Sequence, residues 1–254
     1  MNRWKLTFEY DGRDFSGWQI QPDQRTVEGE VERAFSTLFQ TNIDVVGQGR
    51  TDAGVHARAQ VGHADLPVSA SRNRLLHAMK GLLPSDVALI DAEKTDHDFH
   101  SRFHAVSRRY SYQHIARKSP LMRERAWYSG YSPDIKILSE LSSLIVGKHD
   151  FKNFCIPPDD VHLTTICTIS NSEWIEKDAI LIFTIEGNRF LRHMVRRLVG
   201  SMIKTASGKA DKARFLTLLT DNDAEQKAHS APPCGLYLNE VIYKKTDYPY
   251  GESY

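Results

Sequence analysis

The chain has 254 residues, of which 41% are hydrophobic and 26% charged, with 15 Gly and 10 Pro. This composition is typical of a folded globular protein and excludes the disordered and fibrous classes. The length fits one large domain or two of about 100–150 residues. Because 33 Lys and Arg nearly balance 32 Asp and Glu, the net charge of +1 excludes a uniformly cationic nucleic-acid coat.

No segment resembles a membrane span or a secretion signal. The longest uninterrupted apolar run, Ala179 to Phe183, has five residues, whereas a membrane span needs roughly 20. The first ten residues alternate polar and apolar side chains and lack the apolar core of a signal peptide. We therefore expect a soluble, cytoplasmic protein.

The cysteines give no sign of a metal centre. Cys155, Cys167 and Cys234 match no zinc-binding spacing and, being three, cannot all pair. We expect free thiols and no metal site.

The first part of the chain predicts strands and helices in alternation. Trp4, Leu6, Phe8 and Tyr10 repeat with period two and indicate a strand that ends at the turn-forming Asp11-Gly12. Thr26 is a suitable cap for a helix whose apolar residues follow helical spacing from Val27 to Leu38. Further elements are predicted as a strand over 43–46, a weaker strand over 61–66, a helix over 72–83 and a strand over 87–92.

A comparable order begins again near residue 105. The predicted elements are a strand through Tyr110 and Tyr112, a helix from Ser132-Pro133 to Gly147, a hairpin of strands over 165–175 and 179–186, a helix over 190–206 and a strand over 236–243. This alternation favours an α+β fold with largely antiparallel sheets. We expect two related subdomains, 1–104 and 105–254, that share a cleft.

The segment Gly47-Gln-Gly-Arg-Thr-Asp-Ala-Gly-Val-His56 surrounds one acid with three glycines. Such a composition favours close approach of the backbone to another group, and the segment fits neither the P-loop nor the dinucleotide-binding pattern. In an extended segment, Arg50 and Asp52 would project on the same side, and the guanidinium would keep the carboxylate ionised as a nucleophile or base. A structural ion pair is an equally good interpretation.

Cations and aromatic rings occur together in two later segments. Arg108-Arg109-Tyr110 on a strand suits stacking against a base and neutralisation of a phosphate, although an ordinary amphipathic strand would look similar. Arg189, Arg192 and Arg196 are spaced to share one face of the predicted helix. Residues 102–125 and 189–212 each hold seven Lys or Arg and one acid, +6 apiece, so the other 206 residues carry −11. This distribution favours an anionic partner.

Several motifs occur in a fixed order along the chain. They are Tyr10-Asp-Gly-Arg-Asp-Phe-Ser-Gly-Trp-Gln19, Gly49-Arg-Thr-Asp-Ala-Gly-Val-His-Ala57, Leu83-Pro-Ser-Asp-Val87, Phe99-His-Ser-Arg-Phe103 leading to Arg109-Tyr110, His149-Asp-Phe151, His193-Met-Val-Arg196 and Gly235-Leu-Tyr-Leu238. Over nearly its whole length the chain resembles the TruA-type tRNA pseudouridine synthases. Gln48 departs from that family, where alanine is common.

The resemblance implies an isomerase that needs neither cofactor nor metal. Such enzymes break the N-glycosidic bond of a uridine, turn the uracil and join C5 to C1′, at positions 38, 39 and 40 of the tRNA anticodon stem-loop. The resemblance also implies two ferredoxin-like (RRM-like) subdomains flanking a basic cleft, and a homodimer.

The resemblance also implies roles for individual residues. By match to the motifs, Asp52 is the catalytic aspartate, Arg196 pairs with it, and Tyr110 stacks on the target base. We add Arg50 to the expected catalytic set. A further set is expected to contact the substrate: Arg58, Arg109 and Arg192.

Two other interpretations compete with this one. Basic segments and aromatic rings alone would satisfy a non-catalytic RNA-binding protein. A metal-dependent hydrolase would use acids such as Asp11, Asp14 and Asp52.

Overall fold

The computed structural model describes residues 1–157, 164–221 and 228–244. These residues form an α+β fold around one ten-stranded sheet, whose main path runs β4-β1-β3-β10-β5-β9-β8-β7. The sheet is antiparallel except where β10 meets β3 and β6 meets β5. The predicted fold class is therefore confirmed in its coarse form, but a single continuous sheet replaces the separate sheets that the sequence suggested.

The first half of the chain builds one end of the sheet. Its elements are β1 (Asn2–Tyr10), α1 (Val27–Phe39), β2 (Val46–Gly47), β3 (His56–Leu66), α2 (Arg72–Leu82) and β4 (Val87–Lys94). The hydroxyl of Thr26 accepts a hydrogen bond from the Gly29 N–H and that of Ser71 from the Arg74 N–H, so both helices begin at capping residues. The period-two strand and both helices predicted here are confirmed.

The second half builds the other end. Its elements are β5 (Ala105–Ile115), β6 (Trp127–Tyr128), α3 (Ile135–Leu144), β7 (Gly147–Asp150), β8 (Ile166–Lys177), β9 (Ile180–Gly187), α4 (Met194–Ala206), α5 (Lys212–Thr220) and β10 (Leu236–Tyr243). The predicted hairpin is β8–β9, and its turn places Asp178 and Ala179 at φ +53° and +60°. Both values belong to the left-handed region that a two-residue hairpin turn requires.

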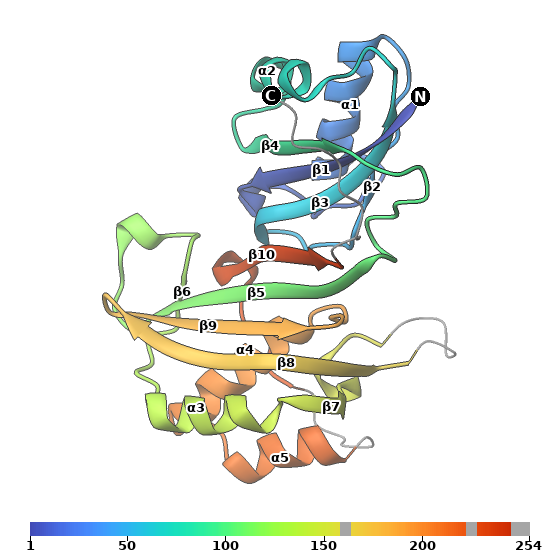
Figure 1. Cartoon of the computed structure of the whole chain (residues 1–254). Coiled ribbons are helices and arrows are strands. Elements are labelled where there is room, and N and C mark those ends of the chain that lie inside the picture. The colour runs from blue at the N-terminus through green and yellow to red at the C-terminus, as the bar shows by residue number, and fades with distance from the viewer. Residues whose placement is uncertain (158–163, 222–227, 245–254) are drawn as a thin grey trace.

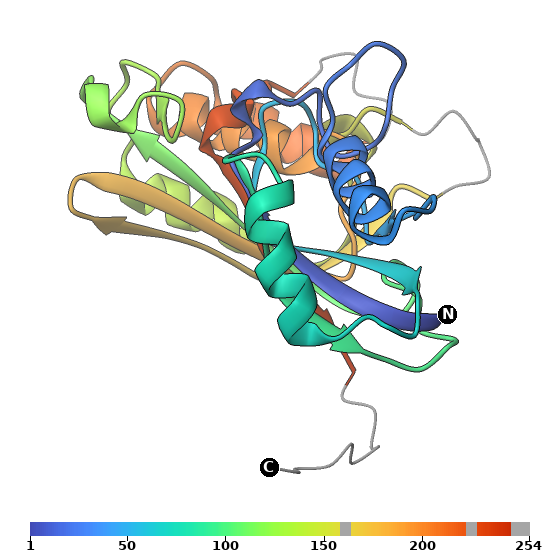
Figure 2. The same cartoon turned by 90° about the horizontal axis from the view of Figure 1, so that it is seen from above.

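Strand β10 joins the two ends of the sheet. It pairs in parallel with β3, Tyr237 opposite His56, and antiparallel with β5, Leu238 opposite Tyr110. Figure 1 shows β10 and β5 midway through the sheet, with α1 and α2 at one end and α3 and α5 at the other. Seen from above, α4 and the connection between β1 and α1 lie on the same side of the sheet (Figure 2).

Several element boundaries differ from those predicted. The strand expected over 43–46 is the short β2, and α3 begins after Asp134, whose carboxylate caps it in place of Ser132. Helix α4 begins at Met194, not at residue 190, because His193 takes a left-handed φ of +64° that a continuing helix does not allow. Elements β6, β7 and α5 were not predicted.

Apolar side chains form two buried clusters, one at each end of the sheet. The first contains Phe8, Trp18 and Phe35, and the second contains Phe151, Phe183 and the inner face of α4. All three cysteines are free, as expected, and burial raises the pKa of Cys155 and Cys167 to about 11. In the part of the chain described, no helix is long and apolar enough to cross a membrane.

One fully buried histidine makes the fold sensitive to acid. His114 on β5 is 0% exposed, and its Nε2 lies 2.6 Å from the Ser129 hydroxyl. Burial lowers the pKa of His114 to about 4, because the interior disfavours the charged ring. The unfolded chain takes up this proton near pH 6.5 and the folded chain only near pH 4, so folding is weakened as the pH falls through that window.

We expect His114→Gln to flatten the pH dependence of stability. Chemical unfolding at several pH values measures this dependence. Between pH 6 and 5, His114 should cost the wild type roughly 1 kcal/mol of unfolding free energy per pH unit, and the variant should not show this contribution. The same change at exposed His77 is the control and should leave the slope as it is. Equal slopes in the wild type and His114→Gln would contradict this account.

Candidate active site

Asp52 lies in the loop between β2 and β3. The loop is not extended at this point, because the Val55 N–H donates to the Asp52 carbonyl at 3.2 Å and Gly54 has φ +77°. The Asp52 side chain is 22% exposed. A tight turn therefore presents the carboxylate at the surface of the loop, where a substrate can reach it.

The first motif of the sequence braces this loop. The hydroxyls of Tyr10 and Thr51 lie 2.8 Å apart, and the backbone N–H of Trp18 donates to the Thr51 carbonyl at 3.2 Å. Gly17 has φ +99°, and a Cβ atom there would lie 2.6 Å from the Thr51 carbonyl oxygen. Only glycine allows the two loops to approach so closely.

Arg196 is the cationic partner of Asp52. Its Nη1 donates to Asp52 Oδ2 at 3.1 Å, across 144 positions of sequence, and its side chain is only 14% exposed. The rest of the side chain is fixed, since Arg196 Nε donates to the Ala231 carbonyl and the Ala231 N–H donates back to the Arg196 carbonyl, both at 2.9 Å. The fork of the guanidinium thus holds the 231 segment and the carboxylate at once. The pairing that the resemblance implied is present.

His193 is also a neighbour of Asp52. No role was predicted for His193, although it is the first residue of the His193-Met-Val-Arg196 motif. Its Nε2 lies 3.6 Å from Asp52 Oδ2, and the residue occupies the N-cap of α4. Burial lowers the pKa of His193, Arg196 and Arg192 lower it further, and Asp52 opposes them. Arg196 consequently supplies the main positive charge facing Asp52 at neutral pH.

Tyr110 lies on β5 next to the same loop. Its ring meets the ring of Phe190 edge to face, with centroids 5.1 Å apart. Burial raises the pKa of Tyr110 to about 12, Arg108 opposes the shift, and the charge of Asp52 adds to it. The phenol therefore stays neutral, and its ring is a fixed apolar surface within the electrostatic reach of Asp52.

The predicted pairing of Arg50 with Asp52 is wrong. Arg50 is exposed and makes no hydrogen bond or ion pair with any residue that the structure describes. The rule that residues two apart share a side holds for extended chain, and Asp52 lies in a turn. Arg50 is left as an exposed cation on the loop that carries Asp52.

Arg109 does not face the loop. Neighbouring residues of a strand point to opposite faces, and Arg109 donates to Glu186 at 2.8 Å and to Glu240 at 2.6 Å. Both its partners are carboxylates on adjacent strands, β9 and β10. In this structure Arg109 belongs to a cross-strand ion-pair network, and its contact with a substrate stays a prediction.

The other predicted contact residues are exposed. Arg58 follows the loop on β3, with its guanidinium 5.5 Å from the centre of the Tyr237 ring. Arg192 lies before α4, so the predicted helical stripe of Arg189, Arg192 and Arg196 does not form. Arg189 donates to the Thr164 carbonyl instead.

The hydrogen-bond chain that links Arg108 to Gln48 was not predicted, although the sequence had placed Arg108 in a segment suited to RNA. Arg108 Nε donates to Gln48 Oε1 at 3.0 Å, and Gln48 Nε2 donates to Gln60 Oε1 at 3.1 Å. Gln60 in turn donates to the Gly49 carbonyl at 2.9 Å. This buried chain of hydrogen bonds ties the loop to β5, and the departure of Gln48 from alanine was its only signal in the sequence.

The acids of the hydrolase interpretation are not gathered together. Asp11 pairs with Arg13 at 3.0 Å and Arg125 at 3.1 Å, whereas Asp52 pairs with Arg196. Within the described ranges, no group of three or more His, Cys, Asp or Glu is placed to hold a metal ion.

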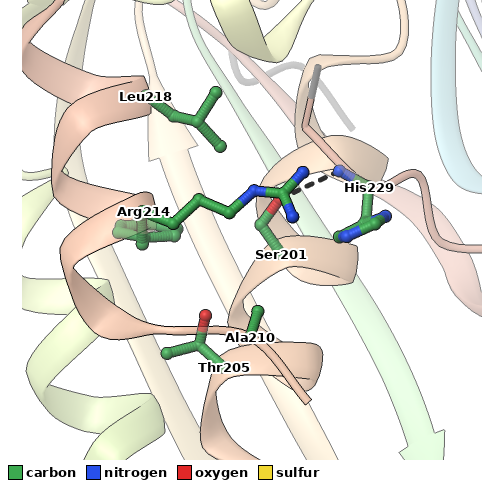
Figure 3. A pocket seen from close by; sticks show the side chains of 7 residues that line it. Ser201, Thr205, Ala210, Arg214, Leu218 and His229 are labelled. Carbon is green, nitrogen blue, oxygen red and sulfur yellow. Dashed lines mark hydrogen bonds between the residues drawn. The ribbon is translucent and has the colours of Figure 1, made fainter. Parts of the chain in front are cut away.

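A separate small pocket lies between α4 and α5 (Figure 3). Its lining includes Ser201, Arg214 and His229, and Asp52 takes no part in it. The His229 N–H donates to the Ser201 hydroxyl at 3.2 Å, which closes one side of the pocket. The pocket is not part of the Asp52 site.

Known proteins resemble the chain over nearly its full length. The sequence profile of a family described as tRNA pseudouridine synthase matches residues 6–104 and 142–244. Among relatives called tRNA pseudouridine synthase A, the proteins of Latilactobacillus sakei and Bacillus subtilis are each 38% identical over 95% of this chain and 99% of their own, and that of Chlorobaculum tepidum is 36% identical over 94% and 97%. A chain from a Cbf5-Nop10-Gar1 complex aligns at 10% identity with a TM-score of 0.35, over 92% of this chain and 57% of its own.

We expect Gly17→Ala to destabilise the protein. The left-handed backbone and the contact with Thr51 together should cost roughly 2 kcal/mol or more of unfolding free energy, measured by chemical denaturation. Gly81→Ala is the matched control, because a Cβ there meets nothing within 4 Å and Gly81 lies in α2. The control should gain roughly 0.5 kcal/mol. Equal stabilities of the two variants would refute the bracing role of Gly17.

Proposed function

This chain belongs to the tRNA pseudouridine synthase family, and we propose that it isomerises uridine to pseudouridine at positions 38, 39 and 40 of the tRNA anticodon stem-loop. The observation that carries the proposal is the Asp52 carboxylate held by Arg196 within reach of the Tyr110 ring. These are the three residues that match the family's motifs.

Asp52 faces the ribose of the target uridine in this proposal. The reaction breaks the bond from C1′ to N1, joins C1′ to C5, moves a proton away from C5 and gives one to N1. Positive charge develops at C1′ as the first bond breaks, as in other glycosidic cleavages, and a carboxylate stabilises it. The hydrogen bond from the Arg196 guanidinium holds the Asp52 carboxylate aimed at that position.

Tyr110 holds the uracil while it turns. A base must leave the RNA stack before chemistry on its ribose can occur, and unstacking costs a few kcal/mol. A flat aromatic ring recovers part of this cost, because every base offers a π face. Phe190 packs nearly at right angles to the Tyr110 ring and supports it in place.

Exposed arginines around the loop bind the RNA backbone. Arg50 and Arg192 have no ion-pair partner in the described chain, and Arg58 projects from the strand that follows the loop. An exposed arginine without a carboxylate partner can bind a phosphate group without first breaking an ion pair, so such arginines contribute most to RNA affinity. Arg50 therefore moves, in this proposal, from a catalytic to a backbone-binding role.

The proposal extends to the finer architecture that the family implies. The division into ferredoxin-like subdomains 1–104 and 105–254 is supported by the strand orders β4-β1-β3 and β10-β5-β9-β8, in which each half places its last strand beside its first. A cytoplasmic homodimer is the assembly that we propose.

Mapping pseudouridines in total tRNA from cells with and without the gene identifies the positions modified.

We expect Asp52→Ala to abolish pseudouridine formation in a tRNA transcript while leaving the affinity for that tRNA within several-fold, because only the reacting group is lost. Chemical labelling of pseudouridine and a filter-binding titration provide the two measurements. Asp14→Ala is the control, since Asp14 is exposed, and it should keep full activity without added metal. Turnover by Asp52→Ala would rule out the assignment, and tRNA binding without turnover by the wild type would favour the non-catalytic alternative.

We expect Arg196→Ala to lower kcat roughly 100-fold or more, the scale seen when one charge-stabilising donor is removed from an active site. Arg196→Lys should recover only part of this loss, because a single ammonium cannot hold the Ala231 carbonyl and Asp52 as the fork does. Single-turnover kinetics measure both variants. The exposed Arg33 on α1 is the comparison, and Arg33→Ala should have no effect. A full rate in Arg196→Lys would contradict the role of the fork.

A further inference from the structure

The connection between β4 and β5 displays an aromatic ring to solvent. Phe103 is 73% exposed, and the other phenylalanines of the chain are buried or partly buried. Single exposed apolar residues are common on protein surfaces, and Leu121 and Val68 are exposed here as well, so the surroundings of the Phe103 ring decide whether it can bind a partner.

The ring is held in its exposed position by a rigid loop. Ser101 is fully buried, its hydroxyl donates to the Val46 carbonyl at 2.7 Å, and its N–H donates to His63 Nδ1 at 3.2 Å. The His104 N–H donates to the His100 carbonyl at 3.1 Å and closes a turn around Phe103. Both sides of the ring's backbone are therefore fixed, so little conformational freedom is left to lose on binding.

Phe103 ends a short series of neighbouring rings that are tilted against one another. The His63 and His100 ring centroids are 4.7 Å apart at an interplanar angle of 57°, and those of His100 and Phe103 are 4.3 Å apart at 38°. The Arg102 guanidinium lies 5.7 Å from the centre of the Phe103 ring. One side of the ring is thus backed by His100, and its exposure leaves room for another planar group.

Arg108 fastens this loop to the proposed active site. Its Nη2 donates to the Arg102 carbonyl at 3.0 Å, and its Nη1 donates to the Ala105 carbonyl at 3.0 Å and to the Asn188 carbonyl at 2.8 Å. Its Nε is the donor to Gln48, in the loop that carries Asp52. The Phe103 loop, the segment before α4 and the catalytic loop therefore meet at one guanidinium, two residues from Tyr110.

The charge around Phe103 favours RNA over protein as its partner. Arg102 is exposed and makes no ion pair within the described chain, and His104 is exposed as well. Residues 102–125, which begin here, carry +6. A protein interface would require a larger contiguous apolar core, whereas one aromatic ring beside cations is the arrangement that binds a base and its phosphate.

We propose that Phe103 is a second stacking platform, which holds an unpaired base of the tRNA anticodon stem-loop other than the target uridine. The proposal rests on the proposed function, since it assumes that the target occupies the Tyr110 site. Stacking on Phe103 would fix the RNA beside the cleft while the target base turns, and Arg102 would neutralise the phosphate next to the stacked base.

The test compares Phe103→Leu with Phe103→Trp on an anticodon stem-loop RNA. Stacking on one ring is worth about 1–3 kcal/mol per base, so we expect KM to rise roughly 10-fold in Phe103→Leu with kcat within about twofold of the wild type. Phe103→Trp should restore KM, and its added fluorescence should be quenched by the stem-loop and not by a fully paired RNA duplex. Leu121→Ala, at an 89% exposed apolar residue of the same basic segment, is the matched control and should change nothing.

Several outcomes would overturn the proposal. A wild-type KM in Phe103→Leu would show that the ring binds no base, and a changed molecular mass in solution would assign it to contact between copies of the chain. Quenching by the paired duplex as strongly as by the stem-loop would exclude an unpaired base. If wild-type protein forms no pseudouridine, the proposed function fails, and the fluorescence titration still reports on stacking separately.

Discussion

The ion pair between Arg196 and Asp52 is the contact on which the site depends. It joins the β2–β3 loop of the first half to the first turn of α4 in the second half. Both halves are needed to hold the carboxylate. Its position therefore depends on β10, which pairs with β3 on one side and β5 on the other and so joins the two halves. Because Arg196 is also fixed on the Ala231 backbone, the pair is rigid before any substrate arrives.

The same docking decides which cations face a substrate. Although residues 102–125 carry +6, Arg109 forms ion pairs with Glu186 and Glu240 on the other face of the strand. The guanidinium of the neighbouring Arg108 donates hydrogen bonds to three backbone carbonyl groups and to Gln48, and so holds the surrounding loops together. A near-neutral protein can thus offer a cationic surface, provided that the exposed arginines are the ones around Asp52.

Local signals in the sequence predicted local structure well. The Thr26 cap, the helix over 72–83 and the period of β1 depend only on neighbouring residues, and these predictions are confirmed. The start of α4 was missed because His193 leaves the helical region while the apolar spacing continues through it. The predicted pairing of Arg50 was wrong because Asp52 lies in a turn, and the carboxylate partners of Arg109 were missed because they depend on strand register, which is set by contacts far apart in sequence. Asp52, Arg196 and Tyr110 were found through motif resemblance, which records such distant contacts indirectly.

The central claim is that a turned-out uridine occupies the space between Asp52 and Tyr110. A crystal structure of the Asp52→Asn protein with an anticodon stem-loop tests it most directly. The account predicts that C1′ of one uridine lies against residue 52, with its base on the ring of Tyr110 and outside the RNA stack. An RNA that binds over Arg109 on the opposite face of the sheet, or that keeps every uridine stacked, would contradict it.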